Sequence, residues 1–161
     1  MSRYVFYDAD VTGKEEYDIC GQDYATLIKT CCKYCNTLSF RITHADTSFV
    51  AELEKFAVHR NNELHNAYEH YYGDNLNENA LTEIRYYEAN KEMEEFILSV
   101  SNSVFDWIYG WGYTNPEDLA FYREDGSLFF YATVHEGMCV LTPNAGESID
   151  EIVSNGLWRK S

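Results

Sequence analysis

A hairpin signal in the C-terminal third constrains the fold more than any other feature of the sequence. Two apolar runs, residues 119–122 and 128–134, flank a polar segment that contains Asp125 and Gly126. An Asp-Gly pair between apolar runs predicts a tight β-hairpin, because glycine accepts the positive φ that such a turn requires. Residues 138–141 have the apolar character of a third strand, which would extend the hairpin into an antiparallel meander.

Helical spacing of apolar residues predicts two helices in the first half of the chain. Asp23 has the chemistry of an N-cap, and apolar side chains recur at helical spacing over residues 24–35. Asp46 or Thr47 is expected to cap a second helix, whose apolar stripe covers residues 49–72.

A third amphipathic helix, with a very acidic outer face, is expected from residue 81 to beyond residue 104. Residues 4–7 and 38–43 have the composition or the alternation of strands. Residues 148–154 predict a short helix that ends at Gly156 in the C-cap position. The sequence thus predicts an α+β fold in which long amphipathic helices pack with the C-terminal β-meander.

A chain of 161 residues is close to the size of one domain and can bury one core. No internal repeat or linker divides it, so residues 1–161 are expected to form a single domain. No apolar window reaches the roughly 18 residues that a membrane span requires, and the N-terminus lacks the apolar stretch of a secretory signal. The expected location is the cytoplasm.

Five cysteines, an odd number, favour reduced thiols over a disulfide framework. Cys32 and Cys35 have the two-residue spacing of metal knuckles and redox pairs. The chain offers no second pair of this kind to complete a zinc site, and these two fall near the predicted end of a helix, where redox pairs do not lie. We therefore expect buried structural thiols and no metal or other cofactor.

Histidines offer the other candidate chemistry. His59, Glu63 and His70 recur on one predicted helical face, and His135 stands beside Glu136. Two histidines three helical turns apart are separated by about 16 Å and cannot share one metal ion, and neighbouring residues of a strand point to opposite faces. No phosphate-binding glycine loop or nucleophile elbow occurs. The chain is predicted not to be an enzyme; the alternative is a small enzyme that uses a metal or one of the thiols.

The charge is strongly asymmetric. The formal net charge is -15, and residues 63–161 hold 18 of the 27 acidic residues but only five of the 12 basic ones. Such a field repels the phosphates of nucleic acid and attracts basic proteins. The sequence therefore predicts no direct binding of nucleic acid, and a basic protein as partner. Acidity that serves solubility alone is the alternative interpretation.

Aromatic residues are interleaved with this acidic region. Tyrosine and tryptophan give large contact areas with a polar tip, and exposed rings beside carboxylates suit capture of arginine and lysine side chains. Adjacent tyrosine pairs cannot all turn inward, so some are expected on the surface. The predicted partner-binding residues are Tyr71, Tyr72, Tyr86, Tyr87, Glu88, Glu92, Glu94, Glu95 and Trp111.

Residues 117–141 contain the segments Asp-Leu-Ala-Phe-Tyr, Asp-Gly-Ser-Leu-Phe-Phe-Tyr and Val-His-Glu-Gly. This stretch of about 25 residues resembles small immunity proteins of bacterial polymorphic-toxin systems. The resemblance implies inhibition by tight binding, in which the chain covers the active site of a cognate toxin such as a basic nuclease. Phage-encoded inhibitors of host nucleases, of the anti-CRISPR or DNA-mimic type, have the same composition and are the alternative.

Overall fold

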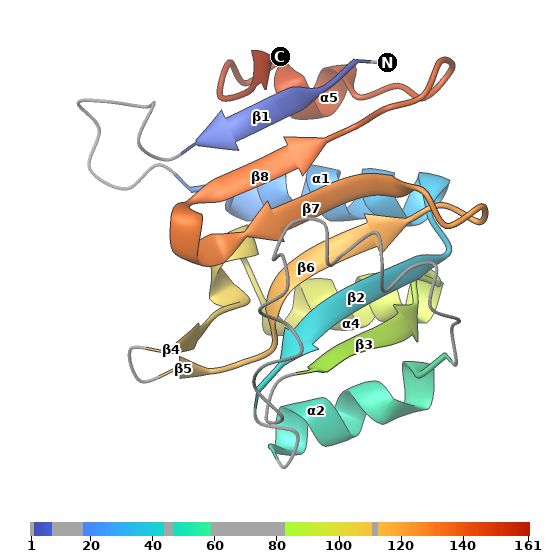
Figure 1. The fold of residues 1–161 in the computed structure, drawn as a ribbon, viewed down its shortest axis with the longest axis vertical. Coiled ribbons are helices and arrows are strands. Elements are labelled where there is room, and N and C mark those ends of the chain that lie inside the picture. The colour runs from blue at the N-terminus through green and yellow to red at the C-terminus, as the bar shows by residue number, and fades with distance from the viewer. Residues whose placement is uncertain (1, 8–17, 44–46, 59–82, 111–112) are drawn as a thin grey trace.

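The computed structural model describes residues 2–7, 18–43, 47–58, 83–110 and 113–161 (Figure 1). Seven strands of this part of the chain form one antiparallel sheet in the spatial order β3-β2-β6-β7-β8-β1-β9. The strands are β1 (Tyr4–Tyr7), β2 (Thr37–Ile42), β3 (Glu83–Glu88), β6 (Glu117–Tyr122), β7 (Leu128–Thr133), β8 (Met138–Leu141) and β9 (Arg159–Lys160).

Helices and short ribbons connect the strands. The α-helices are α1 (Gly21–Tyr34), α2 (Ser48–Leu53), α4 (Lys91–Val100) and α5 (Asp150–Val153). Single 3-10 turns form at η2 (Glu54–Phe56), η4 (Val104–Asp106) and η5 (Val134–Glu136), and β4 (Tyr109–Gly110) pairs with β5 (Tyr113–Thr114).

The predicted C-terminal strands are present. Strands β6, β7 and β8 pair consecutively, and the turn between β6 and β7 places Gly126 at a φ of 87°. The predicted strands β1 and β2, the helix α1 and the short helix α5 also form. The existence of these elements is confirmed because each depends on a short pattern with one dominant period. The predicted cap of α1 is wrong, because the helix begins at Gly21 with Cys20 at the N-cap and Asp23 lies within its first turn.

The predicted packing of long amphipathic helices with a C-terminal meander is wrong. The meander is part of a seven-stranded sheet, in which β2 lies between β3 and β6 and β1 lies between β8 and β9. Residues 83–88, assigned to a long helix, form the edge strand β3, and the helix α4 begins only after Asn90. The helix expected over 49–72 ends as α2 at Leu53 and continues as η2, and residues 59–72 lie outside the described part of the chain.

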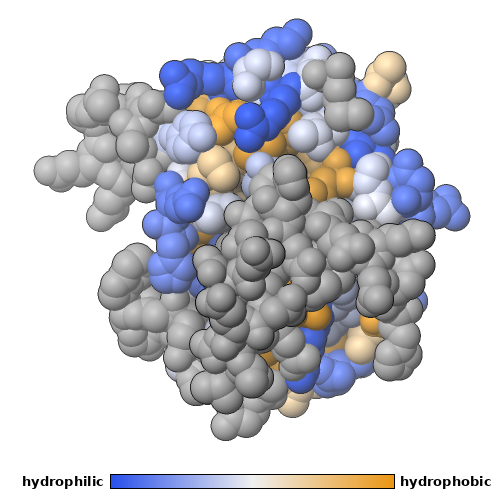
Figure 2. All heavy atoms as spheres, viewed as in Figure 1, coloured by the Kyte–Doolittle hydropathy of each residue, from blue (hydrophilic) through white to orange (hydrophobic). Residues whose placement is uncertain are grey.

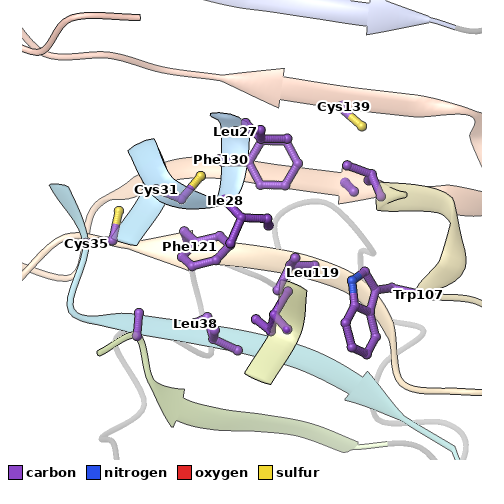
Figure 3. Packing of buried hydrophobic residues seen from close by; sticks show 14 of the residues in the cluster. Leu27, Ile28, Cys31, Cys35, Leu38, Trp107, Leu119, Phe121, Phe130 and Cys139 are labelled. Carbon is purple, nitrogen blue, oxygen red and sulfur yellow. The ribbon is translucent and has the colours of Figure 1, made fainter. Parts of the chain in front are cut away.

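The main core lies between the sheet and the helices α1 and α4. Leu27, Ile28 and Cys31 of α1 pack with strand residues such as Leu38 and Phe121 (Figure 3). Two hydrogen bonds fix this layer from inside: Trp107 Nε1 donates to the Tyr24 hydroxyl at 2.8 Å, and that hydroxyl lies 2.6 Å from Ser101 Oγ. A buried tyrosine and tryptophan thereby satisfy each other's polar atoms.

The other face of the sheet carries a second buried cluster, which contains Val5, Ala120, Tyr122, Tyr131 and Val140. In the view of Figure 2, apolar residues of the described chain are seen between hydrophilic residues at its periphery. Within the residues that the structure describes, no helix has the length and apolar character needed to cross a membrane.

Candidate partner-binding surface

Helix α4 presents an acidic outer face. The Asn90 side chain caps the helix by accepting a hydrogen bond from the backbone N–H of Met93 at 2.9 Å. Met93 and Ile97 turn into the core, whereas Glu92 and Glu95 are exposed. This division follows from helical spacing, because residues three or four apart share a face. The two carboxylates are neighbours on one turn of the outer face.

Helix α2 and the turn η2 lie beside α4. Phe96 of α4 contacts Phe49 and Phe56, with ring centroids 5.5 and 5.9 Å apart. The Thr47 hydroxyl caps α2 by accepting from the backbone N–H of Val50, which confirms the capping role predicted for this threonine. The aromatic contacts therefore join two elements that are separated by more than 30 residues in the sequence.

We define the α2–α4 surface as Glu52, Lys55, Glu88, Glu92 and Glu95, all of which are exposed. Among the described residues, none pairs ionically with Glu52, Glu92 or Glu95. The Glu88 carboxylate accepts a hydrogen bond from the Asn90 side chain at 3.2 Å. The surface therefore holds four outward-facing carboxylates and one lysine.

Lys55 is held over aromatic rings. Its ammonium nitrogen lies 4.9 Å from the ring centroid of Phe56 and 5.6 Å from that of Phe96. Both distances are in the range of cation–π attraction. Phe56 is 2% exposed, so the aliphatic stem and ammonium of Lys55 lie against a ring that is otherwise inside the protein.

Two of the predicted partner-binding tyrosines belong to the sheet. Tyr87 is 0% exposed and packs in the main core with its ring centroid 6.2 Å from that of Phe40. Tyr86 is half-buried on the opposite face, where its ring meets that of Tyr122 edge-on at 5.9 Å. The tyrosines of this pair point to opposite faces because they are neighbours in a strand. Tyr87 therefore lies in the core, and Tyr86 is the partly exposed member of the pair.

The predicted glutamates separate into two groups. Glu88, Glu92 and Glu95 are exposed as expected, but Glu94 is 6% exposed and pairs with the ammonium of Lys91. Glu94 is therefore not on the exposed outer face of α4, because it follows Met93 toward the packed side of the helix. Tyr71, Tyr72 and Trp111 lie outside the described residues.

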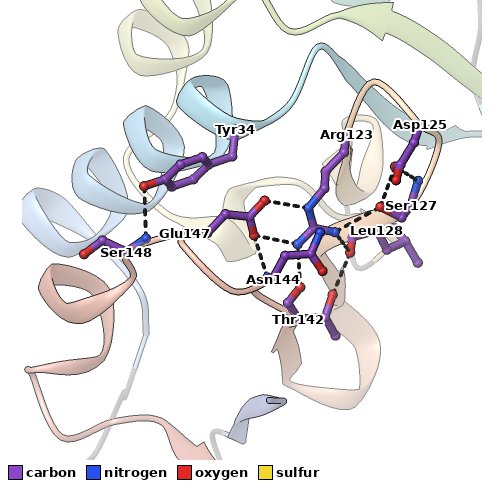
Figure 4. A network of polar contacts seen from close by, with 9 residues as sticks. All are labelled: Tyr34, Arg123, Asp125, Ser127, Leu128, Thr142, Asn144, Glu147 and Ser148. Carbon is purple, nitrogen blue, oxygen red and sulfur yellow. Dashed lines mark hydrogen bonds and ion pairs between the residues drawn. The ribbon is translucent and has the colours of Figure 1, made fainter. Parts of the chain in front are cut away.

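A buried ion pair fixes the loop that follows β8 (Figure 4). The Arg123 guanidinium donates to both carboxylate oxygens of Glu147 at 2.7 Å, and to the backbone carbonyls of Leu128 and Thr142. The bonds from Arg123 lower the pKa of Glu147 below its ordinary value. The guanidinium is fully engaged within the fold, so this arginine serves structure.

A second buried carboxylate, Glu117, joins β2, β6 and η5. It is 3% exposed and lies 2.9 Å from His135 Nε2 and 3.6 Å from Arg41. The next residue, Asp118, has a φ of 58° and accepts a hydrogen bond from the backbone N–H of Val134. Sequence spacing paired His135 with Glu136, which is exposed, and gave no sign of the contact with Glu117.

Three of the five cysteines are buried thiols. Cys31, Cys35 and Cys139 are buried, Cys20 is exposed, and none of the five forms a disulfide. Burial, with a smaller contribution from Glu94, raises the pKa of Cys32 to about 12. A thiol of such high pKa is a poor nucleophile at neutral pH. Within the described ranges no group of three or more histidine, cysteine and acidic side chains is placed to hold a metal ion.

A groove of about 690 Å³ lies between the start of β1 and the loop 143–150. Ser2, Tyr4, Ser148 and Asp150 line it, together with Glu147, which Arg123 already holds. Across the described part of this lining, no hydrogen bond joins a hydroxyl to an acidic or histidine side chain.

Sequence reasoning missed Glu52, Lys55 and Phe96 as members of one surface. Each residue was predicted only as part of its own helix: Glu52 and Lys55 lie in the predicted second helix, and Phe96 lies in the predicted third. Nothing in the linear sequence places that helix beside α4, because the contact between Phe56 and Phe96 spans 40 positions.

The chain matches no protein-family model, and comparisons with curated proteins and with solved structures find no significant match.

Proposed function

We propose that this chain is an acidic binding protein that neutralises a basic protein partner through the α2–α4 surface, as an immunity protein does for its cognate bacterial toxin. One observation carries the proposal. Four exposed carboxylates gather on the α2–α4 surface beside Lys55, and the exposed Lys91 of α4 is already paired with Glu94; Glu117 and Glu147 are held inside the fold, and other exposed acids, such as Asp150 and Glu151, lie elsewhere on the surface.

The exposed carboxylates of the α2–α4 surface act on the approach and the orientation of a cationic protein. Exposed carboxylates that share a face produce a field that speeds association with a cationic protein and that weakens as salt rises. The same carboxylates contribute little to the stability of the free protein, since exposed charges are well solvated. A surface of this kind is suited to a partner whose own active site is basic because it binds phosphates.

A phage-encoded inhibitor of a host nuclease would use the same chemistry and is the second candidate. The identity of the captured protein separates the two. A toxin encoded next to this chain supports the immunity role, and a host nuclease with a phage early operon around the gene supports the inhibitor role. A small enzyme that depends on a metal or a thiol is the remaining alternative.

The test uses two matched double variants. Glu92→Lys with Glu95→Lys reverses two charges on the α2–α4 surface, and Asp150→Lys with Glu151→Lys reverses two exposed charges on α5, near the opposite end of the sheet (Figure 1). Each pair changes the net charge equally; the α4 pair includes one acidic residue of a first helical turn, Glu92, and both residues of the α5 pair lie in one. A difference in association rate between the two variants therefore reflects where the reversed charges lie on the protein, because the total charge is the same.

Immobilised wild-type protein is exposed to extract of the source organism at low and at high salt, and basic proteins retained only at low salt are purified. We expect the α4 variant to slow association with the retained partner by about tenfold or more, and the α5 variant to change it much less. Retention of no basic protein, or equal slowing by both variants, would overturn the proposal.

A further inference from the structure

We infer that the Phe56–Phe96 pair is the anchor for an arginine of the partner, and that Lys55 occupies this anchor in the free protein. The inference deepens the proposed function and rests on it, because it names the side chain that the α2–α4 surface receives.

The geometry of the anchor is built from three elements. Phe56 comes from η2 and Phe96 from α4, and their ring centroids are 5.9 Å apart. Lys55 places its ammonium within 6 Å of both centroids. Glu52 precedes Lys55 by one helical turn and Glu92 precedes Phe96 by one turn, so exposed carboxylates flank the two rings.

Lys55 of the same chain lies over the Phe56–Phe96 anchor, which indicates that the anchor attracts a cation. An exposed lysine has many solvated conformations, and this one lies over two rings among acidic residues. The aromatic faces and the surrounding carboxylates thus attract a cation from within the protein. Lys55 is exposed and carried on a flexible stem, so its departure needs no change of backbone.

An arginine side chain fits the Phe56–Phe96 anchor better than a lysine side chain does. A guanidinium is planar, stacks on aromatic faces, and can donate at the same time to a carboxylate in a two-pronged geometry. An ammonium is more strongly hydrated and lacks this planar fork. The charge around the rings is complementary to either cation, but the combination of ring faces and neighbouring carboxylates favours arginine.

The experiment compares hexa-arginine with hexa-lysine peptides, which carry equal charge, by titration at low ionic strength. Wild-type protein should bind hexa-arginine more tightly. Phe96→Leu should remove this preference while keeping most of the side-chain volume. The matched control is Phe105→Leu, since Phe105 is also half-buried but packs against Phe6 at a centroid distance of 6.1 Å.

A second experiment removes the lysine side chain that lies over the Phe56–Phe96 anchor. Lys55→Ala should tighten hexa-arginine binding by about two- to fivefold relative to Lys160→Ala, in keeping with the strength of exposed cation–π contacts. Lys160 is the matched lysine, because its ammonium lies 6.0 Å from the Tyr4 ring at the other edge of the sheet. This arm remains decisive if Phe96→Leu fails to fold.

The outcomes separate the two proposals. The anchor inference would be contradicted if Phe96→Leu kept the preference for hexa-arginine, or if Lys55→Ala and Lys160→Ala had equal effects on binding. Neither result would count against the α2–α4 surface as the binding face. Peptide binding that is unchanged by reversing Glu92 and Glu95 would instead count against the α2–α4 surface as the binding face.

Discussion

Arg123 makes five hydrogen bonds, to Glu147, Leu128, Thr142 and Ser127, and its side chain is 9% exposed. A guanidinium removed from water requires this many acceptors, since each unsatisfied N–H would cost desolvation energy. The chain thus uses one of its few basic residues to tie the β6–β7 hairpin to the loop after β8. This arrangement makes the stability of the fold sensitive to a single carboxylate.

Glu147→Gln should destabilise the protein by about 3 kcal/mol, because it leaves a buried guanidinium without its counter-charge. Glu54→Gln is the control, because the Glu54–Arg85 contact is also short, at 2.9 Å, but its side chains are 53% and 29% exposed. This variant should cost under about 1 kcal/mol. Urea denaturation measures both free energies of unfolding. Equal losses would show that the Arg123 pair is not the stabilising feature.

The same pair makes a prediction for acid pH. Arg123 holds the folded-state pKa of Glu147 below the ordinary value of 4.5. The stabilisation is therefore fully present above pH 4.5 and is lost as the pH falls through the folded-state pKa. We expect the difference in unfolding free energy between wild type and Glu147→Gln to shrink below pH 4.5. A difference that stays constant through this range would contradict the assignment.

Thiol reactivity should follow burial. Cys20 is exposed, whereas Cys31, Cys35 and Cys139 are buried, and a shift of the Cys32 pKa from 9.0 to about 12 lowers its thiolate fraction about a thousandfold. In native protein at mildly alkaline pH, Cys20 should react first with a chromogenic disulfide, and the buried thiols only after denaturation. A thiolate at Cys32 or Cys35 that reacts near neutral pH, or stoichiometric zinc, would support the enzyme alternative.

At the scale of elements, the boundary between β3 and α4 shows where periodicity is ambiguous. Ile84 and Tyr87 are three apart and fit a helix, but Ile84 and Tyr86 face one side of the sheet and Tyr87 the other. The β-branched and aromatic residues here suit a strand, and Asn90 suits a cap. Of the helix expected from residue 81 to beyond residue 104, only Lys91–Val100 is helical, the stretch where one period dominates.

Asn90→Ala should destabilise the protein by about 1 kcal/mol, because it removes the side-chain acceptor for the backbone N–H of Met93. The matched variant is Asn102→Ala, since Asn102 is exposed and follows the same helix. Thermal and urea unfolding compare the two. A loss at Asn102 as large as that at Asn90 would indicate a general effect of asparagine rather than capping.

At the scale of the whole molecule, the sheet order is decided by contacts between distant parts of the chain. β2 pairs with β6, and β1 pairs with β8 and β9. Local patterns identify a strand but carry no information on its distant neighbour, so only the consecutive β6–β7–β8 pairing was predictable. The binding surface was predictable in part for the same reason: acidic residues of α4 were found, but α2 beside them was not.

The C-terminus should contribute strongly to stability through Trp158. This residue is 8% exposed and packs on Phe6 with ring centroids 6.0 Å apart. A chain that ends after Gly156 should be less stable than one that ends after Trp158 by about 3 kcal/mol, because burial of the large ring is lost. Urea denaturation of both chains measures the difference. Equal stability would mean that the ring contributes nothing to the core.

The backbone N–H of Ser161 donates to the carbonyl of Arg3 at 2.7 Å, so the two ends of the described chain adjoin at the β9 edge. Affinity tags or dyes attached at either end therefore emerge far from α2 and β3 (Figure 1). A short peptide joining the ends, with new termini opened in the β6–β7 turn at Gly126, would yield a circularly permuted protein with the same strand order. Such a permutant, attached to a support through its new termini in the β6–β7 turn, leaves Lys55 and its neighbours accessible to a captured protein.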